Sequence, residues 1–139
     1  MTLFEDLQQF LAQCQRAQKK AFIAIVGPTA SGKTKLSLKL AKTTGGEIIS
    51  ADSRQVYKYM DIGTDKLPLV MREGVPHHLL DIVDPTEEFT LSQYKRLALA
   101  AIKDIHSRKK VPILCGGTGL YLNAIIENYQ VPRVAPQYD

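Results

Sequence analysis

The chain has 139 residues, of which 45% are hydrophobic and 23% charged. This length fits one ordinary domain that buries roughly two-thirds of its unfolded surface, and the composition excludes disordered and fibrous proteins. The two cysteines, Cys14 and Cys115, lie far apart, so neither a disulfide scaffold nor a zinc site is indicated. The apolar run over 21–26 is far shorter than the roughly 20 residues of a membrane span, and no signal-peptide pattern precedes it. We therefore expect a cytoplasmic protein without membrane contact.

The net charge is +4, from 18 lysine and arginine residues against 14 aspartate and glutamate residues. The basic residues form three clusters: Arg16, Lys19 and Lys20; Lys33, Lys35, Lys39 and Lys42; and Lys103, Arg108, Lys109 and Lys110. This balance is compatible with a polyanionic partner, although a solvated lysine surface is the more common source of such an excess.

Apolar strands and amphipathic helices alternate along the chain. In order, we expect a helix over 1–18, a strand over 21–26, a loop over 27–34, a helix that ends at Gly45 and Gly46, strands over 47–49 and 78–83, a helix from Thr90 to about Ser107, a strand over 111–115 and a helix over 120–127. The continuous apolar run over 21–26 is typical of a central parallel strand covered on both faces. The pattern predicts an α/β fold of the P-loop NTPase type, with a mostly parallel sheet flanked by helices. An amphipathic helix over 1–20 would precede this domain, which would occupy 21–139.

The clearest helix start is at Thr90. Thr90 and Gln93 have the spacing of a capping box, and Phe89 and Tyr94 have that of a hydrophobic staple.

A phosphate-binding loop is predicted directly after the first strand. Its residues are Gly27, Pro28, Thr29, Ala30, Ser31, Gly32, Lys33 and Thr34, which fit G-x-x-x-x-G-K-[ST] at every fixed position. Glycines at both ends let backbone N–H groups approach phosphate oxygens, and the following helix points its positive end at the same place. Lys33 supplies a mobile charge, and the Thr34 hydroxyl can ligate Mg²⁺. The motif names neither ATP nor a reaction.

Two further turns follow strands of the predicted sheet. Asp52 lies in the polar turn over 50–55, which should face the phosphate loop because ligands bind beyond the carboxyl ends of parallel strands. Asp52 could be a metal ligand, a general base or a cap for the residues that follow, and capping is the commonest of these. The Gly-rich turn over 116–119 permits close backbone approach, and Thr118 offers a hydroxyl to a ligand.

Four blocks in this order resemble the tRNA dimethylallyltransferase family. They are GPTASGKT at 27–34, ADSRQVYKYMDIGTDK at 51–66, GVPHHLLDIVDP at 74–85 and GGTGLYLNAII at 116–126. Together they span most of the chain and are far more specific than the phosphate loop alone.

The resemblance implies transfer of a dimethylallyl group from dimethylallyl diphosphate to N6 of an adenosine beside the tRNA anticodon. The loop over 27–34 would then hold a diphosphate leaving group, not ATP, and Thr34 would help to bind Mg²⁺. Asp52 would be the general base, with Lys33 and Thr118 as further catalytic residues. The residues that would touch the target nucleotide of the tRNA are Asp52, Ser53, Arg54, Gln55 and Thr118. No obligate protein partner is evident.

Other polar and aromatic residues in these blocks have more ordinary explanations. We expect structural roles for His77 and His78. Strand-end or turn positions account for Asp81 and Asp84 at least as well as a catalytic acid does, and packing is the commoner role of Tyr57, Tyr59 and Tyr121.

The chain departs from the family in length, because members of the family are substantially longer. Residues 1–139 resemble their N-terminal catalytic part, and 1–20 resemble an extension ahead of the family's usual start. We therefore expect weak tRNA binding, little turnover by this chain alone and an exposed sheet edge that promotes self-association. Two alternatives stay open at this point: a small P-loop nucleotide or metabolite kinase, which ATP affinity would distinguish, and a phosphate-binding module without catalysis.

Overall fold

The computed structural model describes residues 3–27, 32–59, 67, 69–117 and 119–127. Its elements are α1 (Leu3–Arg16), β1 (Ile23–Val26), α2 (Lys33–Thr44), β2 (Glu47–Ser50), the 3₁₀ turn η1 (Leu69–Met71), β3 (His77–His78), α3 (Leu91–Ser107), β4 (Pro112–Gly116) and α4 (Gly119–Ile126). The predicted order of helices and strands is confirmed, with small differences at the ends of most elements.

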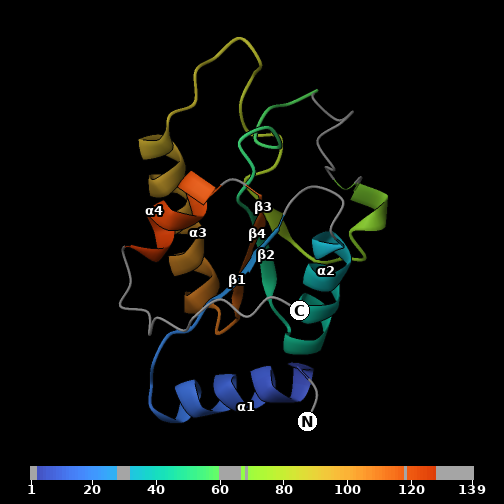
Figure 1. Cartoon of the computed structure of the whole chain (residues 1–139), viewed down its shortest axis with the longest axis vertical. Helices are drawn as coiled ribbons and strands as arrows, with labels where there is room; N and C mark the ends of the chain where they lie inside the picture. The colour runs from blue at the N-terminus through green and yellow to red at the C-terminus, as the bar shows by residue number, and fades with distance from the viewer. Residues whose placement is uncertain (1–2, 28–31, 60–66, 68, 118, 128–139) are drawn as a thin grey trace.

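The four strands form one parallel sheet in the order β1-β4-β2-β3. Helix α2 covers one face and helices α3 and α4 cover the other, while α1 lies across the end of the sheet where the strands begin (Figure 1). This confirms the predicted α/β class. Because all four strands run in the same direction, their carboxyl ends lie together at the end of the sheet opposite α1.

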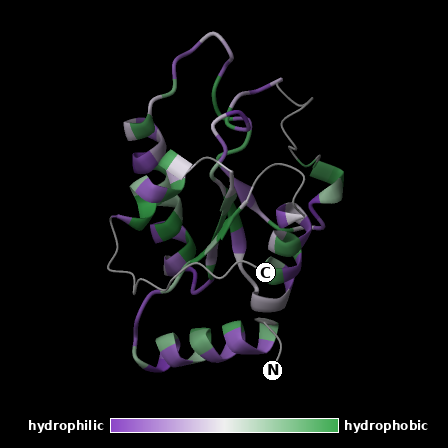
Figure 2. Ribbon diagram, in the orientation of Figure 1, coloured by the Kyte–Doolittle hydropathy of each residue, from purple (hydrophilic) through white to green (hydrophobic). Residues whose placement is uncertain are grey.

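Each face of the sheet buries its own apolar cluster. Ile49 and Leu114 point toward α3 and α4, where Ile102 and Ile105 are also fully buried. The opposite cluster joins Ile48 and Ile113 to Leu38, Leu40 and Ala41 of α2, and Phe4 and Leu7 of α1 pack against it. The middle residues of the central strands β4 and β2 are hydrophobic, whereas β2 begins with Glu47 and ends with Ser50. The helices carry polar residues among their apolar ones (Figure 2). Burial on both faces fixes the position of the strand ends that carry the polar turns.

The strand expected over 78–83 is wrong in extent, because the pairing ends after His78. Leu79 and Asp81 have φ values of +66° and +55°, which an extended strand cannot accommodate. The segment instead turns back onto the residues that follow β2: the Asp81 and Ile82 N–H groups donate to the carbonyl oxygens of Gln55 and Val56 at 3.1 and 2.8 Å.

The central position expected for the first strand is not found among the strands that the structure describes. Among the described strands, β1 pairs with β4 alone and forms an edge of the sheet, and Val26 is 63% exposed. An apolar run indicates that a strand is buried, but it does not indicate whether the strand pairs with one or two neighbouring strands of the sheet.

Helix ends follow the predicted chemistry. The Thr90 hydroxyl accepts the Gln93 N–H at 3.1 Å, and the Gln93 side chain accepts the Thr90 N–H at 2.8 Å, which confirms the capping box. Gly45 ends α2 with φ +71°, a conformation that glycine adopts without strain. In the described part of the chain, no helix combines the length and the apolar character needed to cross a bilayer.

Candidate phosphate and nucleotide site

A pocket opens at the carboxyl ends of the strands, beside the start of α2. Residues from α2, β2, β3, β4 and the turn after β2 line it: Lys33, Thr34, Ser37, Ile48, Ser50, Asp52, Gln55, Leu67, His77, Leu80, Cys115 and Gly116. This is the location at which parallel α/β sheets bind ligands, because the strand ends and helix N-termini converge there.

The first turn of α2 forms one wall of the pocket. Gly32 precedes the helix with φ +84° and, having no side chain, offers no side-chain cap to the first turn. The partly buried side chains of Lys33 and Thr34 line the same wall. A positive helix end with a lysine beside it is suited to an anion. Pro28, Thr29, Ala30 and Ser31 of the predicted loop lie outside the described residues.

Asp52 lines the same pocket, and its side chain is buried. Its Oδ1 accepts the Arg54 N–H at 2.8 Å, and Arg54 Nε lies 3.6 Å from the same oxygen. The capping interpretation thus describes one of its roles, although the residues it caps form a turn and not a helix. Because the same carboxyl group also lines the pocket, its position leaves the metal-ligand and general-base interpretations open.

The turn after β2 brings only some of the predicted nucleotide-binding residues to the pocket. Gln55 lines it, and its Oε1 accepts the Ser50 hydroxyl at 2.9 Å. Ser53 and Arg54 do not line the pocket, and Arg54 is exposed beside it.

The Gly-rich turn after β4 makes the close approach that its composition predicts. A Cβ at Gly116 would overlap the backbone of Ala51, and one at Gly117 would lie 3.1 Å from the Gly27 carbonyl oxygen. The ends of β1, β2 and β4 are therefore packed backbone against backbone. Thr118 lies outside the described residues, so its predicted contact with the nucleotide stays a prediction.

His77 and Cys115 line the pocket without having been predicted there. The His77 ring Nδ1 lies 2.8 Å from the Val75 carbonyl oxygen, which fits a neutral ring that donates through Nδ1–H, and burial lowers the pKa of His77. Burial raises the pKa of the Cys115 thiol, which keeps it protonated and unreactive. Both residues lie on the face that carries α2, because Cys115 pairs with Ser50 and His77 with Ile48, a strand register that the sequence alone does not give.

His78, Asp84 and Tyr121 have structural roles, whereas the packing expected for Tyr59 is wrong because this residue is 80% exposed. His78 Nε2 lies 2.7 Å from the Glu47 carboxylate, as expected for a structural histidine, and Asp84 accepts two hydrogen bonds from Thr86 in a turn. Tyr121 stacks on Tyr94 with ring centroids 3.9 Å apart.

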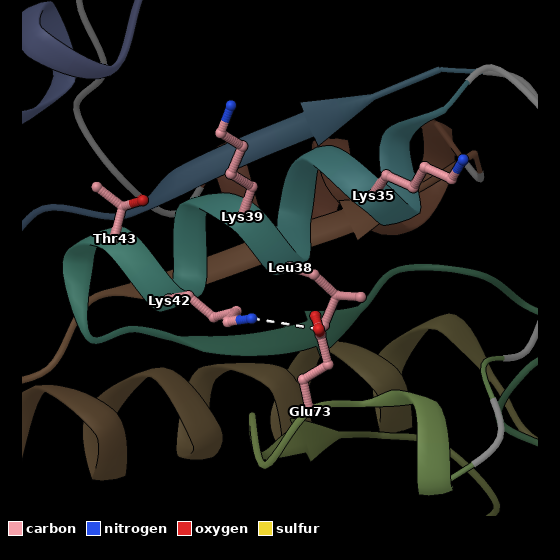
Figure 3. A pocket seen from close by; sticks show the side chains of 6 residues that line it. All are labelled: Lys35, Leu38, Lys39, Lys42, Thr43 and Glu73. Carbon is pink, nitrogen blue, oxygen red and sulfur yellow. Dashed lines mark ion pairs between the residues drawn. The ribbon is translucent and has the colours of Figure 1, made fainter.

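A second hollow lies along α2 and is separate from the pocket that contains Lys33 and Asp52. It is lined by Lys35, Leu38, Lys39, Lys42, Thr43 and Glu73, and Lys42 points toward Glu73 with its Nζ 3.2 Å from the carboxylate (Figure 3). Both side chains of this ion pair are about half exposed, so the pair contributes little to stability.

The parallel sheet and the Gly32–Lys33–Thr34 helix start, with Asp52 in the same pocket, define an α/β domain of the P-loop type. Comparison with known proteins agrees. The family model described as IPP transferase matches residues 55–139, and the one described as isopentenyl transferase matches 20–72. The chain belongs to the IPP transferase family.

The similar proteins are described as transferases that attach dimethylallyl or isopentenyl groups to tRNA. The tRNA dimethylallyltransferase of Roseiflexus castenholzii is 60% identical over 117 residues, which are 84% of this chain and 38% of that protein. The crystal structure of the full-length tRNA isopentenylpyrophosphate transferase from Bacillus halodurans is 50% identical with a TM-score of 0.77, covering 86% of this chain and 39% of that one. A eukaryotic dimethylallyltransferase acting on tRNA is 45% identical with a TM-score of 0.76, covering 82% of this chain and 28% of that one. The chain thus spans about two-fifths or less of the length of these relatives.

Proposed function

We propose that this chain forms the donor-binding and catalytic part of a tRNA dimethylallyltransferase. The reaction would move a dimethylallyl group from dimethylallyl diphosphate to N6 of an adenosine next to the tRNA anticodon. The observation that carries the proposal is that Lys33, Thr34 and the buried Asp52 line one pocket. The reaction needs a cation and a hydroxyl that bind the diphosphate, and close to them a carboxylate that accepts the proton of the amine.

Donor binding would use the wall formed by α2. The diphosphate would lie at the helix N-terminus with Lys33 beside it, where charge develops as the carbon–oxygen bond breaks. Leu67 and Leu80 also line the pocket and would supply an apolar surface for the prenyl group. Diphosphate is the leaving group in this scheme, and ATP has no role in it.

Mg²⁺ is the metal that the loop motif implies, and the described residues fit it. The Thr34 hydroxyl and the Asp52 carboxylate both line the pocket, and Mg²⁺ is commonly held by one or two protein oxygens together with substrate phosphates. Thr34 would hold the ion. When bound, Mg²⁺ neutralises negative charge on the departing diphosphate.

The proton would go to Asp52. As N6 bonds to the allylic carbon and diphosphate leaves, the nitrogen becomes cationic and acidic, so an ordinary carboxylate suffices to accept its proton. The Arg54 N–H bond to Oδ1 holds the carboxyl group in place for this step.

The adenine would have to leave its stack to reach the pocket, which costs a few kcal/mol and requires polar partners inside. Gln55 lines the pocket and would contact the base. Ser53 and Arg54 lie outside it and would contact the tRNA around the target nucleotide, and Thr118 is proposed as a further contact.

Donor binding is tested by calorimetry with inorganic pyrophosphate and Mg²⁺. Lys33→Ala should weaken binding about 10- to 100-fold, because it removes a charge-assisted contact. Lys35→Ala, an exposed lysine on the same helix, should change affinity less than twofold. Equal affinity in the Lys33 variant, or tighter binding of ATP than of dimethylallyl diphosphate, would contradict the proposal.

Catalysis by Asp52 is tested in a chimera of residues 1–127 with the remaining part of the Bacillus halodurans enzyme. Asp52→Asn keeps an oxygen for the Arg54 N–H, so the turn should persist, but the amide cannot accept the N6 proton. Transfer to an anticodon stem-loop should fall at least 100-fold, with donor affinity unchanged within threefold. Retained transfer would show that another group is the base.

A further inference from the structure

A groove with basic walls lies at the end of the sheet opposite the candidate site. It is lined by α1, the segment over 17–21 that leads into β1, and the carboxyl ends of α2 and α3. Figure 1 shows α1 lying across this end of the sheet. Its basic residues are Lys19, Lys20, Lys109 and Lys110, and we call it the basic groove. None of the described residues that line it is an aspartate or a glutamate.

The basic groove joins two of the three basic clusters in the sequence. Lys19 and Lys20 are separated from Lys109 and Lys110 by about ninety positions, yet all four line one surface. A solvated lysine surface explains scattered charges, but it gives no reason for two distant clusters to face one another. Like charges that converge on a hollow raise the free energy of the empty protein and favour an anion between them.

The protein backbone holds both lysine pairs in place. Gln18 has φ +56°, and the N–H groups of Gln18 and Lys19 donate to the Gln15 and Cys14 carbonyls at 3.1 and 2.8 Å, which is a Schellman ending of α1.

The carboxyl end of α3 is built in the same way. Lys109 has φ +59°, and the N–H groups of Lys109 and Lys110 donate to the His106 and Ile105 carbonyls at 2.9 and 3.1 Å. The two endings are tied together, because His106 Nε2 lies 2.8 Å from the Ala21 carbonyl oxygen. The lysine backbones are therefore ordered before any ligand arrives, which lowers the entropic cost of binding.

Three of these lysines are available to a ligand. Lys110 lies 3.7 Å from the Glu47 carboxylate. Lys19, Lys20 and Lys109 are exposed and make no ion pair with any residue in the described part of the chain. Gln8 and Gln15 of α1 add hydrogen-bonding groups to the wall.

We propose that the basic groove binds the phosphodiester backbone of RNA, as a contact separate from the candidate site. Mobile lysine charges along an open hollow suit a linear polyanion read without sequence preference. The choice of RNA as the polyanion rests on the proposed function, in which the substrate is a tRNA. The groove depends on α1, and residues 3–16 lie outside the 20–72 and 55–139 ranges that the family models match, so the contact would be a feature that this chain adds to its family.

The test measures binding of a fluorescein-labelled 20-nucleotide oligouridylate by anisotropy over a salt series. The variant Lys19→Ala/Lys109→Asn removes two groove charges, and asparagine tolerates the positive φ at position 109. At about 0.1 M salt each lost phosphate contact should weaken binding roughly fivefold, so the loss of two contacts should weaken it about 25-fold and lower the salt slope by about 1.4.

The control variant Lys95→Ala/Lys103→Ala removes the same charge from α3 outside the groove and should bind within twofold of the wild type. Equal losses in the two variants, or no loss in the groove variant, would overturn the inference. Pyrophosphate affinity separates this result from the proposed function: it should be the same in both variants. If pyrophosphate fails to bind the wild type while the groove variant still loses RNA, the proposed function fails and the groove inference stands.

Discussion

The Tyr94 hydroxyl donates a hydrogen bond to the Ser50 carbonyl oxygen at 2.9 Å and so fastens α3 to the last residue of β2. Tyr94 is fully buried, and burial raises the pKa of its phenol, so the group stays a proton donor. Asp52 follows Ser50 by two residues. The bond therefore fixes the point at which the strand ends and the turn that carries the candidate base begins.

Tyr94→Phe should lower the free energy of unfolding by about 1–2 kcal/mol, because the Ser50 carbonyl is left buried without its donor. Urea denaturation measures this. Tyr59→Phe is the matched control: Tyr59 is 80% exposed, and its change should stay within about 0.5 kcal/mol. Equal effects in the two variants would mean that the buried bond adds nothing to stability.

Gly116→Ala should be among the most damaging single changes at the site. Its Cβ would overlap the carbonyl carbon and oxygen of Ala51, and backbone atoms on both sides cannot move independently of β2 and β4. We expect a loss of about 3 kcal/mol or more together with weaker pyrophosphate binding. Thermal unfolding and calorimetry provide the two readouts.

Gly119→Ala is the control for this change. A Cβ there meets no atom within 4 Å, and Gly119 begins α4, so alanine should be neutral or slightly stabilising. A Gly116 variant as stable as the Gly119 variant would refute the close approach.

The parts of the site that local chemistry determines could be predicted from the sequence. The capping box at Thr90 depends on residues three positions apart, and the helix start at Gly32 on a contiguous motif, so both could be recognised without a fold. Asp52 could be placed at the strand-end edge because parallel strands share that edge.

The features that were wrong or missed depend on tertiary contacts. Nothing local separates an edge strand from a central one, so the exposed position of Val26 could not be seen in its apolar run. The left-handed conformations of Leu79 and Asp81 arise where the chain turns back onto Gln55, and both are residue types that rarely adopt them. His77 entered the pocket through strand register, which single-sequence patterns do not give.

Glu47 is a buried carboxylate that holds together residues of β2, β3 and the end of α3. It is 1% exposed and accepts from Arg108 through both oxygens, with His78 on the same group. The Arg108 hydrogen bonds, opposed by burial and aided by His78, lower the pKa of Glu47 from 4.5 to about 2. A pKa displaced this far corresponds to about 3 kcal/mol of stability.

Glu47→Gln should therefore cost about 2–3 kcal/mol at pH 7, measured by urea denaturation. The folded pKa lies below the unfolded one, so the contribution is complete above pH 4.5 and lost as the pH falls toward 2. The difference between wild type and variant should shrink over that interval. Glu73→Gln, which breaks the half-exposed pair with Lys42, should cost less than about 0.5 kcal/mol at every pH. If the difference in free energy of unfolding between the wild type and Glu47→Gln does not change with pH, the stabilisation does not come from the ionised Glu47 carboxylate.

His77 should titrate in a different interval from Glu47. Burial lowers its pKa below 6.5 and outweighs the hydrogen bond to Val75, and the charge of Arg72 acts in the same direction. The neutral ring then contributes stability above pH 6.5 that is lost as the pH falls through the folded pKa, because only the unfolded chain readily takes up the proton. Ring-proton NMR of the three histidines, assigned by single glutamine substitutions, should give a His77 midpoint below 6.5. Between pH 7.5 and 5.5 the wild type should lose more stability than His77→Gln does, whereas a midpoint at or above 6.5 would show that the ring is solvated and does not face the pocket as a neutral group.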